Sequence, residues 1–317
     1  MYFLEKKNKN SYEINKNGTI ISLIKEVKHL TYSDSFVFFG QINKKNVIIK
    51  FLLRKTDEAK IIKKIYKSLL IDSFKISIPK DLSFKFEKSV FDIIILKKLG
   101  ESFILYKFDR IDKNKQYFRL FKQILFHLIM FQEKKVLHLD IHKGNITILK
   151  TKQYYHEIKS KGYVLNIKAD FFIFLIDFSR SCILTNFTNI KPHLERIKTL
   201  FYLLLNNNPY FKSSIILSSK DPTKIINEKF TNIFNQITNN LKNNFSLYSR
   251  FLYFIDLLQT INLFLTLFDD KVKHYNKLVD FYGYISKLLL LEFPKKNVKP
   301  PQTIKKIVIK NFGQKIK

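Results

Sequence analysis

The spacing of apolar residues changes near Gly100, and this change limits the folds that the chain can adopt. Before Gly100 the apolar residues form short runs of strand length. We expect β-strands at 36–42, 47–53 and 90–96. The polar residues from Asn43 to Asn46 predict a hairpin turn, and helical spacing from Thr56 to about Leu70 predicts one helix.

After Gly100 the apolar residues follow a helical spacing. They recur every three or four positions from about 115 to 134, as on an amphipathic helix, and this pattern continues to about Leu291. Two short apolar segments, 146–149 and 171–176, interrupt it. The sequence therefore predicts an α+β chain with a small strand-rich part before a larger helical part. We expect the basic tail, 294–317, to lie over the surface.

The composition supports a folded chain with a sizeable core. Hydrophobic residues make up 46% of the 317 residues and aromatic residues 15%, which excludes a disordered chain. Cys182 is the one cysteine, so the sequence excludes a disulfide framework and a cysteine-based zinc site, and we expect Cys182 to be buried. The N-terminus lacks an apolar stretch typical of a signal peptide.

The stretch from Phe251 to Phe268 carries few charges. Asp256, Gln259 and Asn262 interrupt its apolar residues, which favours a buried helix over a membrane span. We therefore expect an intracellular protein without a membrane span.

The chain is strongly basic, with 57 Lys and Arg against 26 Asp and Glu, a formal net charge of +31. Such a field attracts nucleic acid, anionic membranes or acidic peptides. No zinc-finger spacing or basic motif interleaved with aromatic residues accompanies the charge. We interpret most of it as a solvated surface that allows non-specific nucleic-acid contact, and we expect a monomer.

Three polar residues stand where a chemical site would need them. Asp140 and Asn145 are five residues apart between a predicted helix and strand, so they can share one tight loop, and Asp177 follows the next strand. Phosphoryl transfer from a nucleotide needs one carboxylate to orient and deprotonate the hydroxyl. It also needs an amide and a second carboxylate to hold Mg²⁺.

These residues give the sequence a resemblance to the protein-kinase superfamily. Residues 138–145 resemble its H-x-D-x-x-x-x-N catalytic loop, and Asp177-Phe178-Ser179 resembles its D-F-G motif. The resemblance implies that Asp140 is the catalytic base, that Asn145 and Asp177 are metal ligands, and that His138 supports the loop. It also implies a bilobal protein-kinase-like fold, with an N-lobe at 18–98, a C-lobe at 99–293, and ATP and Mg²⁺ in the cleft between them.

The resemblance extends to the strand-rich part. Val47 to Lys50 resembles the V-A-I-K strand, which implies that Lys50 holds the nucleotide phosphates. Glu58 is the candidate partner of Lys50. Residues Leu96 to Gly100 stand where the family binds adenine through the backbone of its hinge, so Leu96 and Lys98 are candidate cofactor-binding positions.

Three positions depart from the family pattern. Thr31 to Ser35 stands in place of the glycine-rich phosphate loop and contains no glycine. Ser179 replaces the glycine of D-F-G, which stiffens that turn. Leu139 replaces the arginine that binds a phosphorylated activation loop, so we expect no such switch.

His142, two positions after Asp140, resembles both haspin-type kinases and aminoglycoside and choline phosphotransferases. The segment 150–170 resembles the insertion that haspin-type kinases carry between the two catalytic strands. We interpret His142 as a hydrogen-bonding residue that helps to hold Asp140. The resemblance to haspin-type kinases implies a location at chromatin in the nucleus. The Lys, Asn, Ile and Phe bias is also typical of a large DNA virus or a reduced parasite, and a viral protein would act in the host cytoplasm or the virion.

The sequence therefore predicts an ATP- and Mg²⁺-dependent serine/threonine protein kinase. Three alternatives stay open. One is a phosphotransferase for a small molecule of the aminoglycoside or choline kind. Another is a pseudokinase that acts as a binding partner, and the last is a basic nucleic-acid-binding module.

Overall fold

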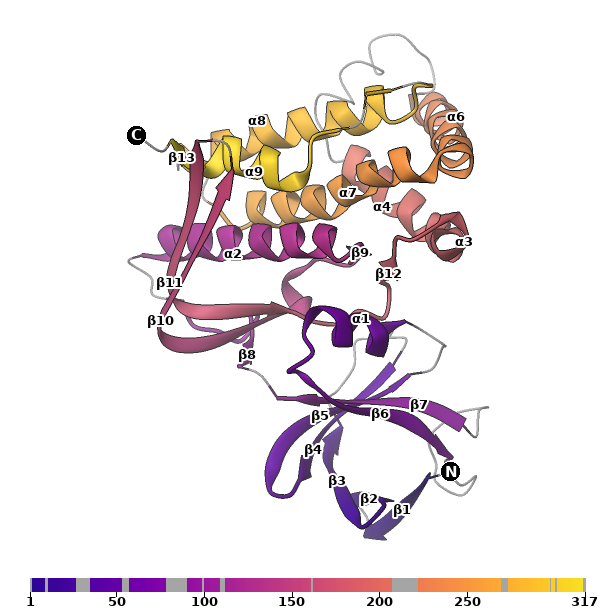
Figure 1. Cartoon of the computed structure of the whole chain (residues 1–317), viewed down its shortest axis with the longest axis vertical. Helices are drawn as coiled ribbons and strands as arrows, with labels where there is room; N and C mark the ends of the chain where they lie inside the picture. Colours follow the sequence, from indigo (N-terminus) through magenta and orange to yellow (C-terminus); the bar gives the residue numbers. More distant parts are fainter. Residues whose placement is uncertain are drawn as a thin grey trace. The chain divides into compact units, whose positions relative to one another are not determined.

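The computed structural model describes residues 2–8, 11–26, 35–52, 57–77, 90–98, 100–108, 112–160, 162–206, 222–268, 273–296, 298–299 and 301–315. The chain divides into two compact units, Met1–Leu99 and Gly100–Lys317 (Figure 1). The loop from Thr31 to Asp34, predicted to approach the phosphates, lies outside the described residues, as does Thr56.

The first unit is one sheet that carries one described helix. Its elements are β1 Tyr2–Asn8, β2 Ser11–Lys16, β3 Thr19–Glu26, β4 Ser35–Ile42, β5 Lys45–Leu52, α1 Glu58–Ile65, β6 Leu70–Ser77 and β7 Val90–Lys97. The strand order is β1-β2-β3-β4-β5-β7-β6. Neighbouring strands are antiparallel except β1 and β6, which pair in parallel and close the sheet on itself. The unit also includes β1 and β2, which lie before residue 18, where the N-lobe was predicted to begin.

The core of this unit comes from alternating positions on its strands. Along β5, Val47, Ile49 and Phe51 are buried in one cluster with residues of β2, β3, β4 and β7. Because successive side chains of a strand point to opposite faces, Lys50 lies on the other face from these residues. The predicted strands are confirmed to within two residues at each end.

The hairpin between β4 and β5 is tighter than predicted. Ile42 pairs with Lys45, so the loop is Asn43-Lys44 alone, and both residues have positive φ angles of 48° and 63°. Two left-handed residues match the twist of the flanking strands, and Asn adopts this conformation readily.

Helix α1 is shorter than predicted. It ends at Ile65 rather than near Leu70, because the chain turns at Lys67 to Leu69 and Leu70 begins β6. The carbonyl of Leu69 already accepts a hydrogen bond from the Lys97 N–H at 3.0 Å. Sheet pairing therefore overrides the helical spacing at this end.

The second unit is mainly helical. Its helices are α2 Lys113–Glu133, η1 Lys143–Asn145, α3 Phe187–Ile190, η2 Lys191–His193, α4 Leu194–Asn206, α6 Pro222–Asn243, α7 Phe245–Leu265, α8 Lys273–Lys287, η3 Leu288–Glu292 and α9 Ile304–Phe312. Its strands are β8 Glu101–Ser102, β9 Val136–Leu137, β10 Ile146–Ser160, β11 Tyr163–Leu175, β12 Cys182–Ile183 and β13 Gln314–Lys315. The helix predicted at 115–134 is confirmed as α2.

The strands β10 and β11 are far longer than the two short segments predicted at 146–149 and 171–176. They pair antiparallel from Ile146 and Leu175 to Ser160 and Tyr163, so the segment 150–170 forms the outer part of one hairpin (Figure 1). Alternate residues of β11 are buried, from Leu165 to Leu175. Up to Phe171 the residues between them are Asn166, Lys168 and Asp170, so this part of β11 has the alternation of a strand with one buried face.

The basic tail does not lie over the surface as predicted. It contains α9, which packs against α2, β10 and β11, and β13, which pairs with β11. Ile304, Ile307, Val308, Ile309 and Phe312 of α9 are buried. Lys305, Lys306 and Lys310 of α9 are three of the eight lysines in 294–317, so a basic tail still contributes a buried helix to the core of the second unit.

Helix α7 lies at the centre of this core. The structure confirms it as a buried helix, with Asp256 buried among its apolar residues. It packs against α2, α4, α6 and α8. Cys182 is buried as predicted. None of the helices that the structure describes is long and apolar enough to cross a bilayer.

The packing of α9 predicts that Phe312→Ala lowers the free energy of unfolding of the second unit by about 3–5 kcal/mol. Phe312 makes edge contacts with the rings of Phe121 and Phe281, each at 5.1 Å between centroids. Urea unfolding followed by far-ultraviolet circular dichroism measures the change, since the chain has no tryptophan. Lys310→Ala, at an exposed position of the same helix, is the control. Equal stability of both variants would contradict the buried position of α9.

Candidate functional site

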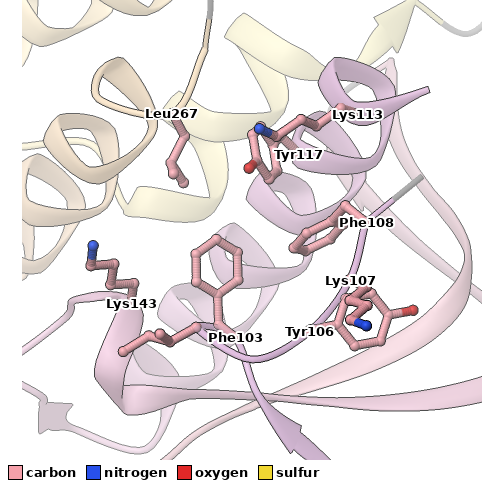
Figure 2. A pocket seen from close by; sticks show the side chains of 9 residues that line it. Phe103, Tyr106, Lys107, Phe108, Lys113, Tyr117, Lys143 and Leu267 are labelled. Carbon is pink, nitrogen blue, oxygen red and sulfur yellow. The ribbon is translucent and has the colours of Figure 1, made fainter. Parts of the chain in front are cut away.

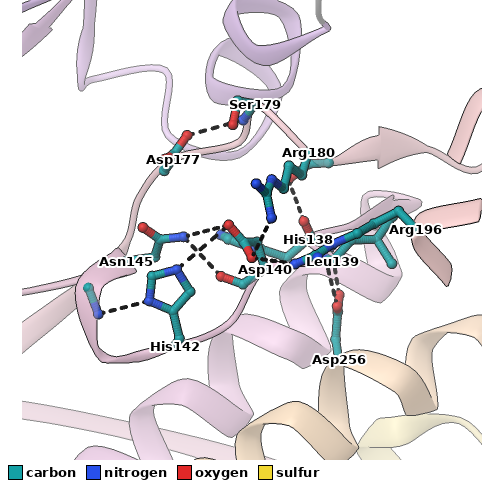
Figure 3. A network of polar contacts seen from close by, with 12 residues as sticks. His138, Leu139, Asp140, His142, Asn145, Asp177, Ser179, Arg180, Arg196 and Asp256 are labelled. Atoms are coloured by element: carbon teal, nitrogen blue, oxygen red, sulfur yellow. Dashed lines mark hydrogen bonds and ion pairs between the residues drawn. The ribbon is translucent and has the colours of Figure 1, made fainter. Parts of the chain in front are cut away.

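Asp140 lies in a loop between β9 and β10 of the second unit (Figure 3). Its side chain is 13% exposed. Arg196 Nη2 lies 2.7 Å from Asp140 Oδ1, and Arg180 Nη1 lies 3.6 Å from the same oxygen. His142 Nε2 lies 3.6 Å from Asp140 Oδ2. One carboxylate therefore meets three basic side chains.

These neighbours keep Asp140 ionised. Burial raises the pKa of the Asp140 carboxyl, but the His142 side chain and the charges of Arg180 and Arg196 outweigh burial, so its pKa lies below the ordinary value. Burial also lowers the pKa of Arg196, whereas the Asp140 carboxylate raises it in part. The Arg196 guanidinium stays charged, because its ordinary pKa is far above neutrality.

Asn145 is fixed by the same loop. Its Nδ2 donates to the backbone oxygen of Asp140 at 3.0 Å and to Asp140 Oδ2 at 3.2 Å. These two acceptors fix the orientation of the amide, so Oδ1 is the atom left for another partner. No residue that the structure describes donates a hydrogen bond to this oxygen. The side chain therefore presents a carbonyl oxygen, the ligand type that Mg²⁺ prefers.

Asp177 reaches the same region through the hairpin. Ile146 pairs with Leu175, and the Ile176 N–H donates to the Asn145 backbone oxygen at 2.9 Å. Asp177 therefore follows directly after the residue bound to Asn145. Its φ of 62° is left-handed, a conformation that Asp tolerates better than most residues. The Ser179 N–H reaches Asp177 Oδ1 at 3.4 Å.

His138 supports the Asp140 loop through its buried side chain. It is buried, its ring lies 4.8 Å from the ring of Phe178, and its Nε2 is 3.2 Å from the Ile176 oxygen. Burial lowers the pKa of His138 to about 4, so the imidazole is neutral. The supporting position predicted for His138 agrees with these contacts, which join the loop to the Asp177 segment.

Asp256 is a site residue that sequence reasoning missed. Its Oδ2 accepts from the His138 N–H at 2.7 Å and its Oδ1 from the Leu139 N–H at 2.8 Å. Leu139 has a φ of 63°, which is unfavourable for a leucine, and the carboxylate holds it there. Burial raises the pKa of Asp256 to about 7, against the effect of the two N–H donors. A lone acid in an apolar helix was the only signal in the sequence.

Arg180 and Arg196 were also missed, because neither belongs to a spacing that predicts contact with Asp140. Arg196 is 56 residues from it, at the start of α4. His142 behaves as predicted, because its Nδ1 accepts from the Gly144 N–H at 3.0 Å while its Nε2 faces Asp140.

In the first unit, Lys50 and Glu58 form the predicted ion pair. Lys50 Nζ lies 2.7 Å and 2.9 Å from the two oxygens of Glu58, and both residues are buried. Lys50 and Glu58 are only eight residues apart, and the tight connection between β5 and α1 still brings their side chains together. The role of Lys50 on phosphates stays a prediction.

The predicted hinge, Leu96 to Gly100, begins at the end of β7, and its Leu99 lies outside the described residues. Leu96 pairs with Ile48 of β5 and Leu70 of β6, so it is a strand residue rather than a loop residue. Lys98 is exposed and its Nζ lies 4.9 Å from the centre of the Phe39 ring. Adenine binding at these positions stays a prediction.

The donor set of the second unit fits Mg²⁺ rather than a metal held by protein alone. Among the described residues, no group of three or more His, Cys, Asp or Glu side chains could hold a metal ion. Asn145 and Asp177 offer one amide oxygen and one carboxylate. Mg²⁺ is usually held by one or two carboxylates together with substrate phosphates and water. These two residues therefore fit a metal that arrives with a nucleotide.

Two solved structures to which the chain is similar are kinase domains. The match to the BubR1 kinase domain covers 97% of this chain and 83% of that chain, with 13% identity and a TM-score of 0.48. The match to the kinase domain of PF14_0431 covers 54% of this chain and 53% of that chain, with 19% identity and a TM-score of 0.34. The chain thus spans about half the length of the second structure.

No protein-family model matches the sequence, and no curated protein matches it. The predicted α+β class is confirmed, with a closed sheet in the first unit and a helical second unit.

The buried position of Asp256 predicts a pH-dependent effect of Asp256→Asn on stability. The pKa of Asp256 is about 7 in the fold against an ordinary 3.8, so the folded protein keeps a proton that the unfolded chain loses between these values. The wild-type free energy of unfolding, relative to that of the variant, therefore falls as pH rises through this window. The slope is at most about 1.4 kcal/mol per pH unit, and the difference is constant above about pH 7.

Urea unfolding at stepped pH measures this difference, and Asp280→Asn, at an exposed position of α8, is the control. The difference for Asp280→Asn should stay flat. A flat difference for Asp256→Asn would show that Asp256 is ionised across the whole window.

Proposed function

We propose that this chain is a kinase that transfers the γ-phosphoryl group of ATP to a serine or threonine hydroxyl of a protein. The observation that carries the proposal is the hydrogen bond between Asn145 and Asp140 on one loop. Asp177 directly follows Ile176, whose N–H binds the Asn145 backbone oxygen. This is the carboxylate, amide and second carboxylate that phosphoryl transfer needs.

Each residue has one proposed task. Asp140 accepts a hydrogen bond from the acceptor hydroxyl, orients it and takes its proton at a carboxylate oxygen. Asn145 Oδ1 and the Asp177 carboxylate hold the metal, and Lys50 steadies the phosphates. Mg²⁺, when bound, neutralises charge on the phosphates. Asp256 and His138 are positioning residues, since they contact the loop backbone and the Asp177 segment.

The subfamily, the location and the oligomeric state are proposed from the sequence. Haspin-type membership is proposed from the insertion 150–170 between the two catalytic strands, since His142 also fits a small-molecule phosphotransferase. We also propose an intracellular enzyme, because a single cysteine, Cys182, fits a reducing compartment, and we propose that it acts as a monomer. A cationic small molecule is the less favoured substrate, because Arg180 and Arg196 would repel it at Asp140.

The proposal predicts phosphate transfer that depends on Asp140. With radiolabelled Mg-ATP, wild type should label a protein substrate, and Asp140→Asn should lower the rate by about 10²–10⁴-fold, since the base is lost. The assay compares casein, histone and an aminoglycoside as acceptors. Asp170→Asn, an exposed acid of β11, is the control.

Transfer to the aminoglycoside alone would replace the protein-kinase proposal with a small-molecule phosphotransferase. Nucleotide binding without transfer to any acceptor would favour a pseudokinase.

A second prediction concerns Lys50. Removing it alone leaves Glu58 buried and unpaired, at a cost of about 3–5 kcal/mol, so a loss of activity could be a loss of folding. The double variant Lys50→Met with Glu58→Gln removes both charges and should stay folded by circular dichroism. We expect it to bind ATP at least about tenfold more weakly, because a charge-assisted bond to phosphate is lost. Wild-type affinity in isothermal titration would exclude Lys50 from the nucleotide site.

A further inference from the structure

The charges around Asp140 do not balance. Arg180 and Arg196 both contact Asp140, and no other carboxylate of the described residues lies within ion-pair distance of either. Two guanidinium charges therefore face one carboxylate. Their side chains are 33% and 29% exposed, so both are accessible to a ligand.

The hydrogen-bonding capacity of these arginines is also unfilled. A guanidinium has five N–H donors, and the hydrogen bond of Arg196 to Asp140 uses Nη2 alone, while its Nε is buried and out of reach of a ligand. Arg180 makes only a 3.6 Å approach to Asp140 Oδ1. Such donors match the planar oxygens of a carboxylate or a phosphate.

A cavity in the second unit reaches the Asp140 loop at Lys143, and its charged lining residues are also basic. It has a volume of about 670 Å³, and its lining is Phe103, Ile104, Tyr106, Lys107, Phe108, Lys113, Tyr117, Lys143 and Leu267 (Figure 2). Three of these are lysines and none is acidic. Lys143 lies on the loop of Asp140, three residues further on.

A substrate of opposite charge fits these observations best. Arg180 and Arg196 lie 3.6 Å and 2.7 Å from Asp140 Oδ1, so the residues next to a hydroxyl bound at this carboxylate are within reach of both guanidinium groups. A chain with a net charge of +31 attracts an acidic segment and repels a basic one such as a histone tail.

We propose that Arg180 and Arg196 form a specificity site for a carboxylate or phosphate next to the acceptor hydroxyl, so that the protein substrate is an acidic or already phosphorylated segment. This inference rests on the proposed function, since it assigns the substrate class of the same site.

Direct peptide binding tests the proposal without any need for phosphate transfer. Fluorescein-labelled peptides with a central serine and flanking Gln, Glu, phosphoserine or Lys are titrated with the full chain, and anisotropy is measured. Wild type should bind the Glu or the phosphoserine peptide about tenfold more tightly than the Gln peptide, and the Lys peptide more weakly. Comparison of the Glu and phosphoserine arms shows which anion is the ligand.

Arg180→Gln should reduce the preference for the acidic peptide, with Arg196 retaining a part of it, and Arg180→Lys should reduce it less. The matched control is Arg119→Gln, which removes the same charge from a side chain that is 31% exposed and pairs with Asp170 at 3.8 Å. This control should keep the full preference. Loss of preference in both variants would mean that total charge decides binding, and would overturn the specificity site.

Two other results would overturn the proposal. One is equal binding of the Gln, Glu and phosphoserine peptides by wild type. The other is a single-stranded oligonucleotide that binds more tightly than every peptide and depends on Arg180, which would make the site a nucleic-acid contact. Failure of the kinase function shows separately, as absence of phosphate transfer to a peptide that binds.

Discussion

The two hydrogen bonds from the His138 and Leu139 N–H groups to Asp256 hold the candidate site in place. Both donors and the carboxylate are buried, so water cannot replace either bond, and each unpaired group would cost about 1–3 kcal/mol. Leu139 has a left-handed backbone that its own side chain disfavours. The chain accepts this conformation because Asp256 binds it. Asp140 is the next residue, so its direction is set from the centre of α7.

The second part of the site depends on α2. Gln123 donates to the Phe171 oxygen at 3.0 Å and accepts from the Ile173 N–H at 3.1 Å, and His127 lies 3.0 Å from the Ile173 oxygen. These buried side chains hold β11 against α2, and β11 leads to Asp177. The Asp140 loop and the Asp177 segment are therefore positioned by two helices that pack against each other. Rigid elements of this kind give a site more precise geometry than loops alone.

The sequence could predict residues whose partners are near in the chain or follow a strand directly. Asp140, Asn145 and Asp177 are of this kind, and so is the Lys50–Glu58 pair. Asp256 and Arg196 contact the loop across 117 and 56 residues, and no local pattern predicts such pairings. The tail from 294 was predicted wrongly for a different reason. Its lysines dominated the composition, while Ile304, Ile307, Val308 and Phe312 already had the spacing of a buried helix face.

The two arginines on Asp140 would be a disadvantage if this residue had to be a strong base, because they lower its proton affinity. Phosphoryl transfer makes a smaller demand. Its transition state is loose, so the hydroxyl needs accurate orientation more than early deprotonation. A carboxylate held by Arg196 at 2.7 Å and Asn145 at 3.2 Å has one fixed direction, which serves orientation. The same contacts leave positive charge beside the acceptor, and so positioning and recognition of an anionic substrate can share one set of residues.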